Sequence, residues 1–171
     1  GISLTSVFSL SSCFVVTERP LCEPKEAKVD SDLLGVWVTD FPDAKELLFF
    51  APSRDGNSCH FYAIGAREDG VLKFSYLGES ICVRAGNHAY MSVPFRLEGL
   101  KEPGHPEQAK LQYFLYSYEL LNGKQRLLLR NSKPEFFAEA VRNKEITGST
   151  ENGVLLTSER DQLFKFLDKN A

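Results

Sequence analysis

The amino-terminal 29 residues lack a stretch of about 20 apolar residues, so they hold no membrane-spanning helix. The chain also lacks an excess of basic residues: its net charge is −3 and its Lys and Arg residues are scattered. Binding to duplex nucleic acid needs a basic stripe, so we predict no nucleic-acid partner. Glycine is dispersed at turns and forms no phosphate-binding loop.

Catalytic and metal-binding patterns are equally scarce. The three histidines, His60, His88 and His105, show no metal-ligand spacing. No serine lies in a Gly-x-Ser-x-Gly context, and Asp40 and Asp43 cluster where a turn favours Asp for backbone reasons. We therefore predict no catalytic residue, no metal and no cofactor. An enzyme is the minor alternative, which requires His60 or His88 beside a carboxylate and a hydroxyl in a pocket.

The first residues are apolar and end in a small-residue motif. Ile2 to Leu10 is an uncharged, moderately apolar run followed by Leu10-Ser11-Ser12-Cys13. The pattern is typical of a signal peptide that is cut before the mature chain. It predicts a signal-peptide remnant at residues 1–12, with lipid attachment at Cys13. The alternative is that residues 2–16 form an ordinary strand or a disordered tail with a free Cys.

The next segment is polar. Thr17 to Asp30 contains Pro20, Pro24 and seven charged residues, which favour an extended linker. We therefore predict a lipid-anchored tether over residues 13–31 and one domain over residues 32–171.

The domain is predicted to be mainly β with minor α. Short runs with turn signals at regular intervals indicate an antiparallel barrel or sandwich. The expected strands are Gly35 to Val38, Glu46 to Ala51, Ser58 to Ala66, Val71 to Leu77, Ser80 to Arg84, His88 to Leu97, Leu111 to Leu121 and Lys124 to Arg130. Asn122-Gly123 favours a two-residue turn that pairs Glu119 with Arg126 and Tyr118 with Leu127.

Two helices are expected near the end of the chain. Ser132 is predicted to cap the first, with Pro134 inside its first turn and an end near Asn143. Thr157 or Ser158 is predicted to cap the second. Its apolar stripe consists of Leu163, Phe164, Phe166 and Leu167.

Three further cysteines follow Cys13. If Asp69-Gly70 makes a two-residue turn, Cys59 faces Ser80, and Cys82 lies diagonally across from Cys59. That diagonal is at the edge of disulfide geometry, so buried free thiols are expected, with a Cys59–Cys82 bridge as the alternative. A bulge at Gly78 would change this register. Cys22 is expected to be exposed.

Aromatic residues supply a large inward surface. We predict that this surface either fills the interior or lines a cavity for an apolar ligand. The candidate lining residues are Trp37, Phe61, Phe74, Phe114, Tyr116 and Tyr118.

Three segments together resemble bacterial lipocalin-like lipoproteins. They are Cys13 to Pro20, Asp32-Leu33-Leu34-Gly35-Val36-Trp37, and Val154-Leu155-Leu156-Thr157-Ser158 leading into Leu163, Phe166 and Leu167. The resemblance implies an up-and-down β-barrel with short C-terminal helices and a lipid anchor in the cell envelope. Because Phe14 and not Asp follows Cys13, it favours the outer membrane, facing the periplasm. It implies no particular activity.

Two functions follow as expectations. The first is a membrane-anchored periplasmic lipoprotein that binds a small apolar ligand in a barrel interior. The alternative is a cell-envelope structural or protein-interaction module with a filled core and no ligand. The expected partners are the membrane, through the anchor, and either the ligand or an envelope protein.

Overall fold

A computed structural model gives the fold. The residues that it describes are 14–38, 46–66, 72–102, 105–121, 125–151 and 153–170, and among these the side chains of 66, 97–102 and 105–109 are not described. Cys13, Asp40, Asp43, the Asn122-Gly123 turn and the His105 side chain therefore lie outside the described residues.

Four consecutive strands form what we call the outer sheet. β2 (Gly35–Val38), β3 (Glu46–Pro52), β4 (Cys59–Ala66) and the first half of β5 (Leu72–Ala85) pair antiparallel in chain order. β5 pairs with β4 through residues 72–80 and with the next strand through residues 81–85. This one long strand therefore belongs to two sheets.

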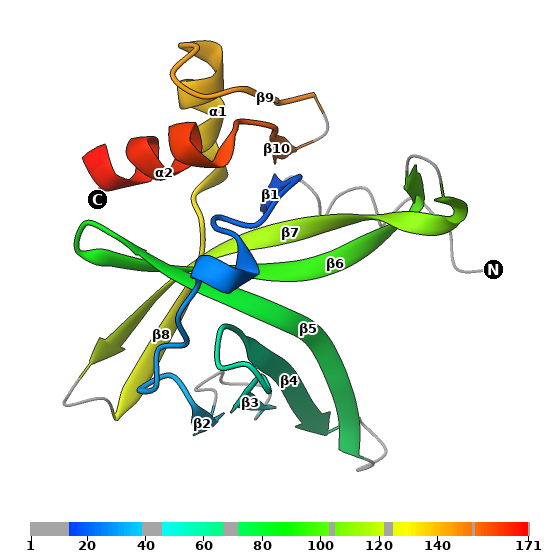
Figure 1. The fold of residues 1–171 in the computed structure, drawn as a ribbon, viewed down its shortest axis with the longest axis vertical. Coiled ribbons are helices and arrows are strands. Elements are labelled where there is room, and N and C mark those ends of the chain that lie inside the picture. Colours follow the sequence, from blue (N-terminus) through cyan, green and yellow to red (C-terminus); the bar gives the residue numbers. More distant parts are fainter. Residues whose placement is uncertain are drawn as a thin grey trace.

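The second half of β5 begins the inner sheet. It pairs with β6 (His88–Glu102), which pairs with β7 (His105–Leu121), which pairs with β8 (Arg126–Asn131). Further back along β7, residues 113–114 pair with β1 (Val15–Thr17). β1 pairs in turn with β10 (Val154–Leu156), and β10 pairs with β9 (Gly148–Ser149). β1 and β10, which are far apart in the sequence, thus lie side by side in this sheet (Figure 1).

The bend between the two sheets occurs at Gly78. The β4–β5 register shifts between Phe61, which faces Gly78, and Tyr62, which faces Tyr76. Gly78 has φ +125°, and a Cβ there would lie 2.5 Å from Cγ of Pro94. Only glycine tolerates both the dihedral angle and the close approach. The expected irregularity at this glycine is therefore present.

Two helices cover one side of the inner sheet. They are α1 (Pro134–Arg142) and α2 (Arg160–Lys169), drawn orange to red in Figure 1. Their buried residues pack with β1, β10 and one face of β5 to β7 in a helix-side core. It includes Val15, Leu21, Tyr90, Leu115, Phe137, Ile146, Leu156, Phe166 and Leu167.

A second core lies between the two sheets. This central core contains Leu33, Phe50, Cys59, Phe61, Cys82, Ala89, Met91, Val93 and Tyr118. The layers therefore run from the helices through the inner sheet to the outer sheet. The inner sheet is buried on both faces, and the outer sheet is buried on one.

The fold is mainly β with two helices at the end of the described chain, as predicted, but over the described residues the sheet is not closed, so the predicted barrel is not confirmed. The strands make one ten-stranded sheet with β2 at one end, and β8 pairs only with β7. In the described residues no ladder joins β2 to β8. The stepwise bend at Gly78 stacks the sheet on itself, and closure would need hydrogen bonds across that seam.

The prediction of a free tether over residues 13–31 is wrong for its described part. Val15 and Thr17 pair with β7 and β10, and each exposes 1% of its surface. Leu21 and Ala27 are also buried, on either side of the short 3-10 helix η3 (Pro24–Glu26). The charges and prolines predicted a linker, whereas the small apolar residues between them insert into the body.

Two local predictions also fail. Leu121, not Glu119, faces Arg126, so the β7–β8 register is displaced by two residues because the connection is longer than two residues. Glu119 instead pairs with Arg130 at 3.4 Å. A shift of two keeps each side chain on its face, so Tyr118 still points inward.

The predicted helix caps are the other failure. Lys133 and Glu159 hold the cap positions, and neither side chain caps its helix. Ser132 Oγ is buried without a hydrogen-bond partner among the described atoms. Ser158 Oγ accepts from Thr147 N at 2.7 Å and donates to its carbonyl at 3.1 Å, so it ties a loop and not a helix.

Candidate functional site

The predicted cavity-lining residues separate into two groups. Phe61 and Tyr118 are buried in the central core, and Trp37, Phe114 and Tyr116 pack against it. Phe74 does not join them, because it exposes 61% of its surface on the other side of the outer sheet. Side chains alternate along β5, so Lys73 and Ser75 lie on the face opposite to Phe74.

Aromatic rings stack between neighbouring strands within each sheet, on the side of the central core. Phe50 stacks on Phe61 with ring centroids 4.4 Å apart, and Phe95 stacks on Phe114 at 4.0 Å. Trp37 Nε1 donates to the Leu33 carbonyl at 2.8 Å, which satisfies its polar atom at the end of this core. These contacts are those of a packed interior.

Two surface hollows lie along the N-terminal segment. The first, of about 430 Å³, contains the polar cluster Asp30, Arg84 and Tyr118. Asp30 Oδ2 accepts from Arg84 Nη2 at 3.0 Å and from the Tyr118 hydroxyl at 3.2 Å. Burial, then nearby Cys82 and Asp30, raise the pKa of Tyr118, so this hydroxyl stays protonated and donates. The cluster fastens residue 30 to the inner sheet.

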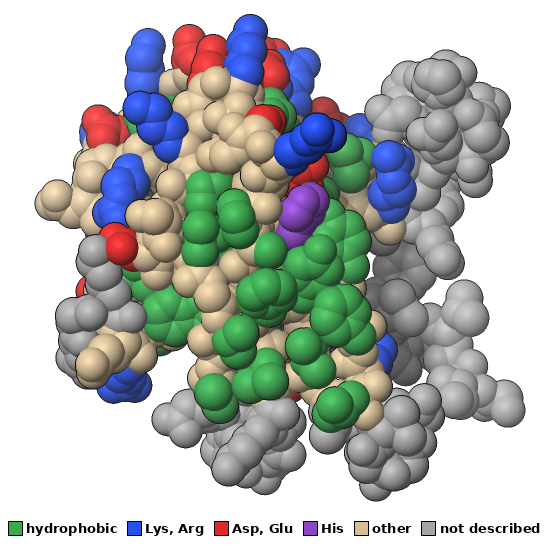
Figure 2. All heavy atoms as spheres, turned by 60° about the horizontal axis from the view of Figure 1, so that its bottom comes forward, with side chains coloured by type: hydrophobic (Ala, Val, Ile, Leu, Met, Phe, Trp, Pro, Cys, Tyr) green, Lys and Arg blue, Asp and Glu red, His purple; other side chains and the backbone are tan. Residues whose placement is uncertain are grey.

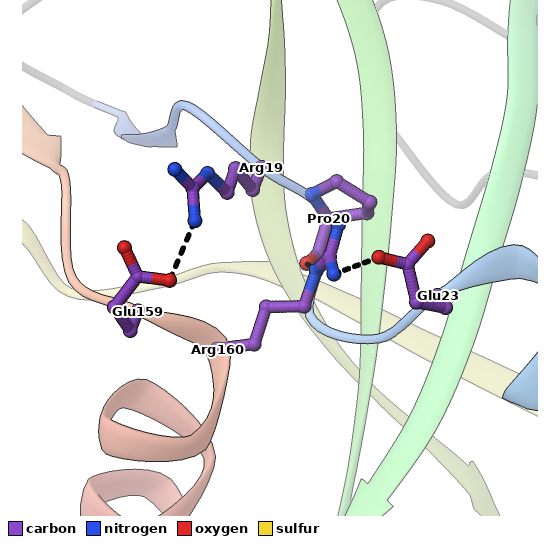
Figure 3. A network of polar contacts seen from close by, with 5 residues as sticks. All are labelled: Arg19, Pro20, Glu23, Glu159 and Arg160. Atoms are coloured by element: carbon purple, nitrogen blue, oxygen red, sulfur yellow. Dashed lines mark hydrogen bonds and ion pairs between the residues drawn. The ribbon is translucent and has the colours of Figure 1, made fainter.

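The second hollow, of about 530 Å³, lies beside α2. Figure 3 shows the contacts that border it: Arg19 Nη1 pairs with Glu159 Oε2 at 2.6 Å, and Arg160 binds both Glu23 and the Pro20 carbonyl, the latter at 3.2 Å. Several of these groups are half-exposed, so the pairs contribute little individually. Together they attach residues 19–23 to the helix layer.

The three described cysteines are free thiols, as expected. Cys59 faces Ser80 as predicted, and both Cys59 and Cys82 are buried. The hydrogen bond with Cys59 and burial raise the pKa of Cys82, so it is a poor nucleophile. Cys22 was expected to be exposed but is half-buried, and burial followed by Glu26 raises its pKa as well.

No group of three metal-ligating side chains occurs within the described part of the chain. His88 is exposed at the start of β6, near Tyr90. His60 lies on β4, where its Nδ1 is 3.0 Å from the Tyr76 hydroxyl. This pair lies on the solvent side of the outer sheet, where Glu79 faces His60 across β4 and β5.

The most unusual feature is the solvent side of the outer sheet, which we call the outer face. The alternation of β2 to β5 places nine apolar or aromatic side chains on it: Val36, Val38, Leu47, Phe49, Tyr62, Ile64, Leu72, Phe74 and Tyr76. Val36, Val38, Leu72, Phe74 and Tyr76 each expose 54–71% of their surface. Figure 2 shows hydrophobic side chains gathered on this part of the molecule beside a histidine.

Aromatic rings form the centre of the outer face. The ring of Tyr62 lies 5.0 Å from that of Tyr76, 5.2 Å from Phe74 and 5.8 Å from Phe49. Burial, Glu79 and Tyr62 raise the pKa of Tyr76, so its hydroxyl is neutral beside His60. The face is therefore an ordered aromatic platform with its polar groups at one edge.

Sequence reasoning missed the outer face as a site. The signal was present in β3, where Leu47 to Ala51 is a continuous apolar run. Such a run is typical of a strand covered on both sides, whereas a strand with one wet side alternates apolar and polar residues.

Comparisons with known proteins add no relative. The sequence matches no protein-family model, and neither the curated proteins nor the solved structures contain a significant match to it. Among the described residues, no helix has both the length and the apolar character to cross a bilayer.

Proposed function

We propose that the protein is a lipid-anchored component of the bacterial cell envelope that acts as an interaction module through its outer face. The observation that carries the proposal is the contrast between the buried central core and an apolar sheet surface open to water. This is the module with a filled core, and we favour it over ligand binding inside a barrel.

The free energy of the outer face supports a docking role. Exposed apolar surface forgoes roughly 25 cal/mol for each Å² that could be buried. Contiguous apolar patches of several hundred Å² on a folded domain mark contact surfaces or aggregation-prone surfaces. A partner that covers the five most exposed side chains would recover this stabilisation.

The charge distribution supports an apolar partner surface. The nine side chains of the outer face are uncharged. The charged group that shares this face within the described residues is Glu79, opposite His60 at its edge. Interface centres are depleted of charge and enriched in aromatic residues, with polar groups at the rim.

The membrane anchor is the second part of the proposal. The small-residue motif Leu10-Ser11-Ser12-Cys13 supports acylation of the Cys13 sulfur. The favoured location is the outer membrane, with the protein facing the periplasm. Labelling with radioactive palmitate is expected to mark the wild type and not Cys13→Ala. An unlabelled wild type would contradict the anchor and would leave the docking surface untested by that assay alone.

In-cell photo-crosslinking tests the docking surface. A photoreactive phenylalanine analogue replaces Phe74, 61% exposed on the outer face, and in a control chain it replaces Phe136, 40% exposed on α1. We expect a discrete protein adduct from position 74 and none, or a different one, from position 136. If neither position forms an adduct while displacement assays detect a bound fatty acid, the ligand-binding function replaces this proposal.

A further inference from the structure

We infer that the outer face binds a second copy of this chain, so that two outer sheets pack face to face about a two-fold axis. This inference rests on the proposed function, because it names the partner of the same surface. Its support comes from the size, the charge and the position of the outer face.

The size of the face suits a dimer. Six of its side chains expose between 37% (Leu47) and 71% (Leu72) of their surface. With about 150–250 Å² for each aromatic side chain and less for each Val or Leu, they present on the order of 600 Å². Two such faces would bury about 1,200 Å² before any rim is counted, which reaches the lower end of stable interfaces at roughly 1,200–2,000 Å².

The charge pattern favours a copy of the chain over a different protein. A two-fold axis places the same patch on both subunits, so the patch must complement itself. Apolar side chains meet this condition without any matched charges, and homodimer interfaces are the more apolar class. His60 and Tyr76 already satisfy each other at 3.0 Å, so neither needs a polar group from a partner.

The centre of the face has the geometry that such packing needs. Tyr62 lies on β4 between Phe49 on β3 and Phe74 on β5, with rings 5–6 Å apart. Two twisted sheets stack about 10 Å apart with strands about 30° from parallel, and their facing side chains interdigitate. An aromatic cluster near the axis would then pack against its own copy.

The position of the face leaves it accessible. The helices cover the opposite face of the inner sheet, and β1 lies within that sheet at a distance from β2, β3 and β4 (Figure 1). Pairing through the outer face therefore leaves both N-terminal segments uncovered. The second copy would cover the open side of the outer sheet, so that the outer sheet, like the inner sheet, would be covered on both sides.

Sedimentation equilibrium of the purified full chain tests the inference, with Phe74→Glu and Leu72→Glu as disrupting variants and Phe136→Glu as the matched control. We expect the mass of two chains for the wild type and the control, and at least a tenfold weaker association for each variant. Both substituted residues are more than 60% exposed, so the variants should fold, and circular dichroism verifies this. Wild type that stays monomeric at the highest soluble concentration overturns the inference.

The same samples separate this inference from the proposed function. A monomeric wild type that forms a discrete adduct with a different protein from position 74 would refute self-association and keep the interaction module. A dimer that Phe74→Glu and Leu72→Glu leave intact would also refute this interface. An adduct of two identical chains from position 74, lost in the Leu72→Glu background, supports both.

Discussion

The inner and outer sheets share β5, yet they have different surroundings. In the inner sheet, Met91 faces the central core and Tyr90 faces the helix-side core, so both sides of β6 are buried. In the outer sheet, Phe50 is 1% exposed, whereas Phe74, on the opposite face, is 61% exposed. The strands of both sheets are similarly apolar. Apolar content therefore does not reveal which sheet has a cover within its own chain.

The largest expected effect comes from truncating the buried phenylalanine of the outer sheet, and truncating an exposed phenylalanine of the same sheet serves for comparison. Phe50→Ala removes a ring stacked on Phe61 and should lower the free energy of unfolding by about 3–5 kcal/mol. Phe74→Ala should cost less than about 1 kcal/mol in dilute solution, because the ring is already hydrated. Urea titration measures both. Equal losses would mean that the outer face is covered in the isolated chain.

The bend that separates the two sheets gives the next largest effect. Gly78→Ala combines a positive φ with a Cβ 2.5 Å from Pro94, and it should cost more than about 2 kcal/mol. Gly35→Ala is the matched control, because Gly35 has φ +127° with nothing within 4 Å of an added Cβ. It shares the backbone strain without the clash. If the two variants unfold at the same urea concentration, the contact between β5 and Pro94 does not shape the bend.

A smaller effect is expected where the N-terminal segment meets the inner sheet. Tyr118→Phe removes the 3.2 Å hydrogen bond to Asp30 while Arg84 still pairs with that carboxylate. The loss should be about 0.5–1.5 kcal/mol. Tyr116→Phe, also in contact with the central core, serves as the control in thermal unfolding. If Tyr118→Phe unfolds at the same temperature as the wild type, the ion pair with Arg84 is sufficient to hold Asp30.

The smallest effect belongs to the β3–β4 loop of the outer sheet. Hydrogen bonds from Ser53 and then Asn57 lower the pKa of Asp55. A lowered pKa in the folded state stabilises the protein above the unfolded pKa, and this stabilisation is lost as pH falls through the folded value. Asp55→Asn should therefore be slightly less stable than wild type at neutral pH and equal to it in acid. A difference that persists in acid would assign the effect to geometry and not to charge.

Much of the strand order could be predicted from local pattern. Turn signals and alternation located the strands of both sheets. The predicted pairing of Cys59 with Ser80 is present, but only because the register shift between Phe61 and Tyr62 offsets a connection that differs from the predicted two-residue turn. Pro134 correctly marked the first turn of α1. These features depend on residues that are near each other in the chain.

The errors arose from contacts between distant residues. The burial of Val15 and Leu21 depends on β7, β10 and α2, which lie about 100 or more residues away in the sequence. The side on which Phe74 lies depends on a bulge that reverses the apparent alternation of β5. The apolar run of β3 marks a strand covered on both sides, but it does not show whether its own chain supplies the cover. The open seam between β2 and β8 has no local signature.

The position of β1 limits the reach of the folded body. β1 begins at Val15, two residues after Cys13, so an extended chain spans at most about 7 Å between them. With an acyl group on Cys13, the folded body would lie directly at the bilayer surface, joined to it by only a few ångströms of chain. What it can touch would then be decided by its own dimensions and orientation, and partners would have to come to within one molecular diameter of the lipid.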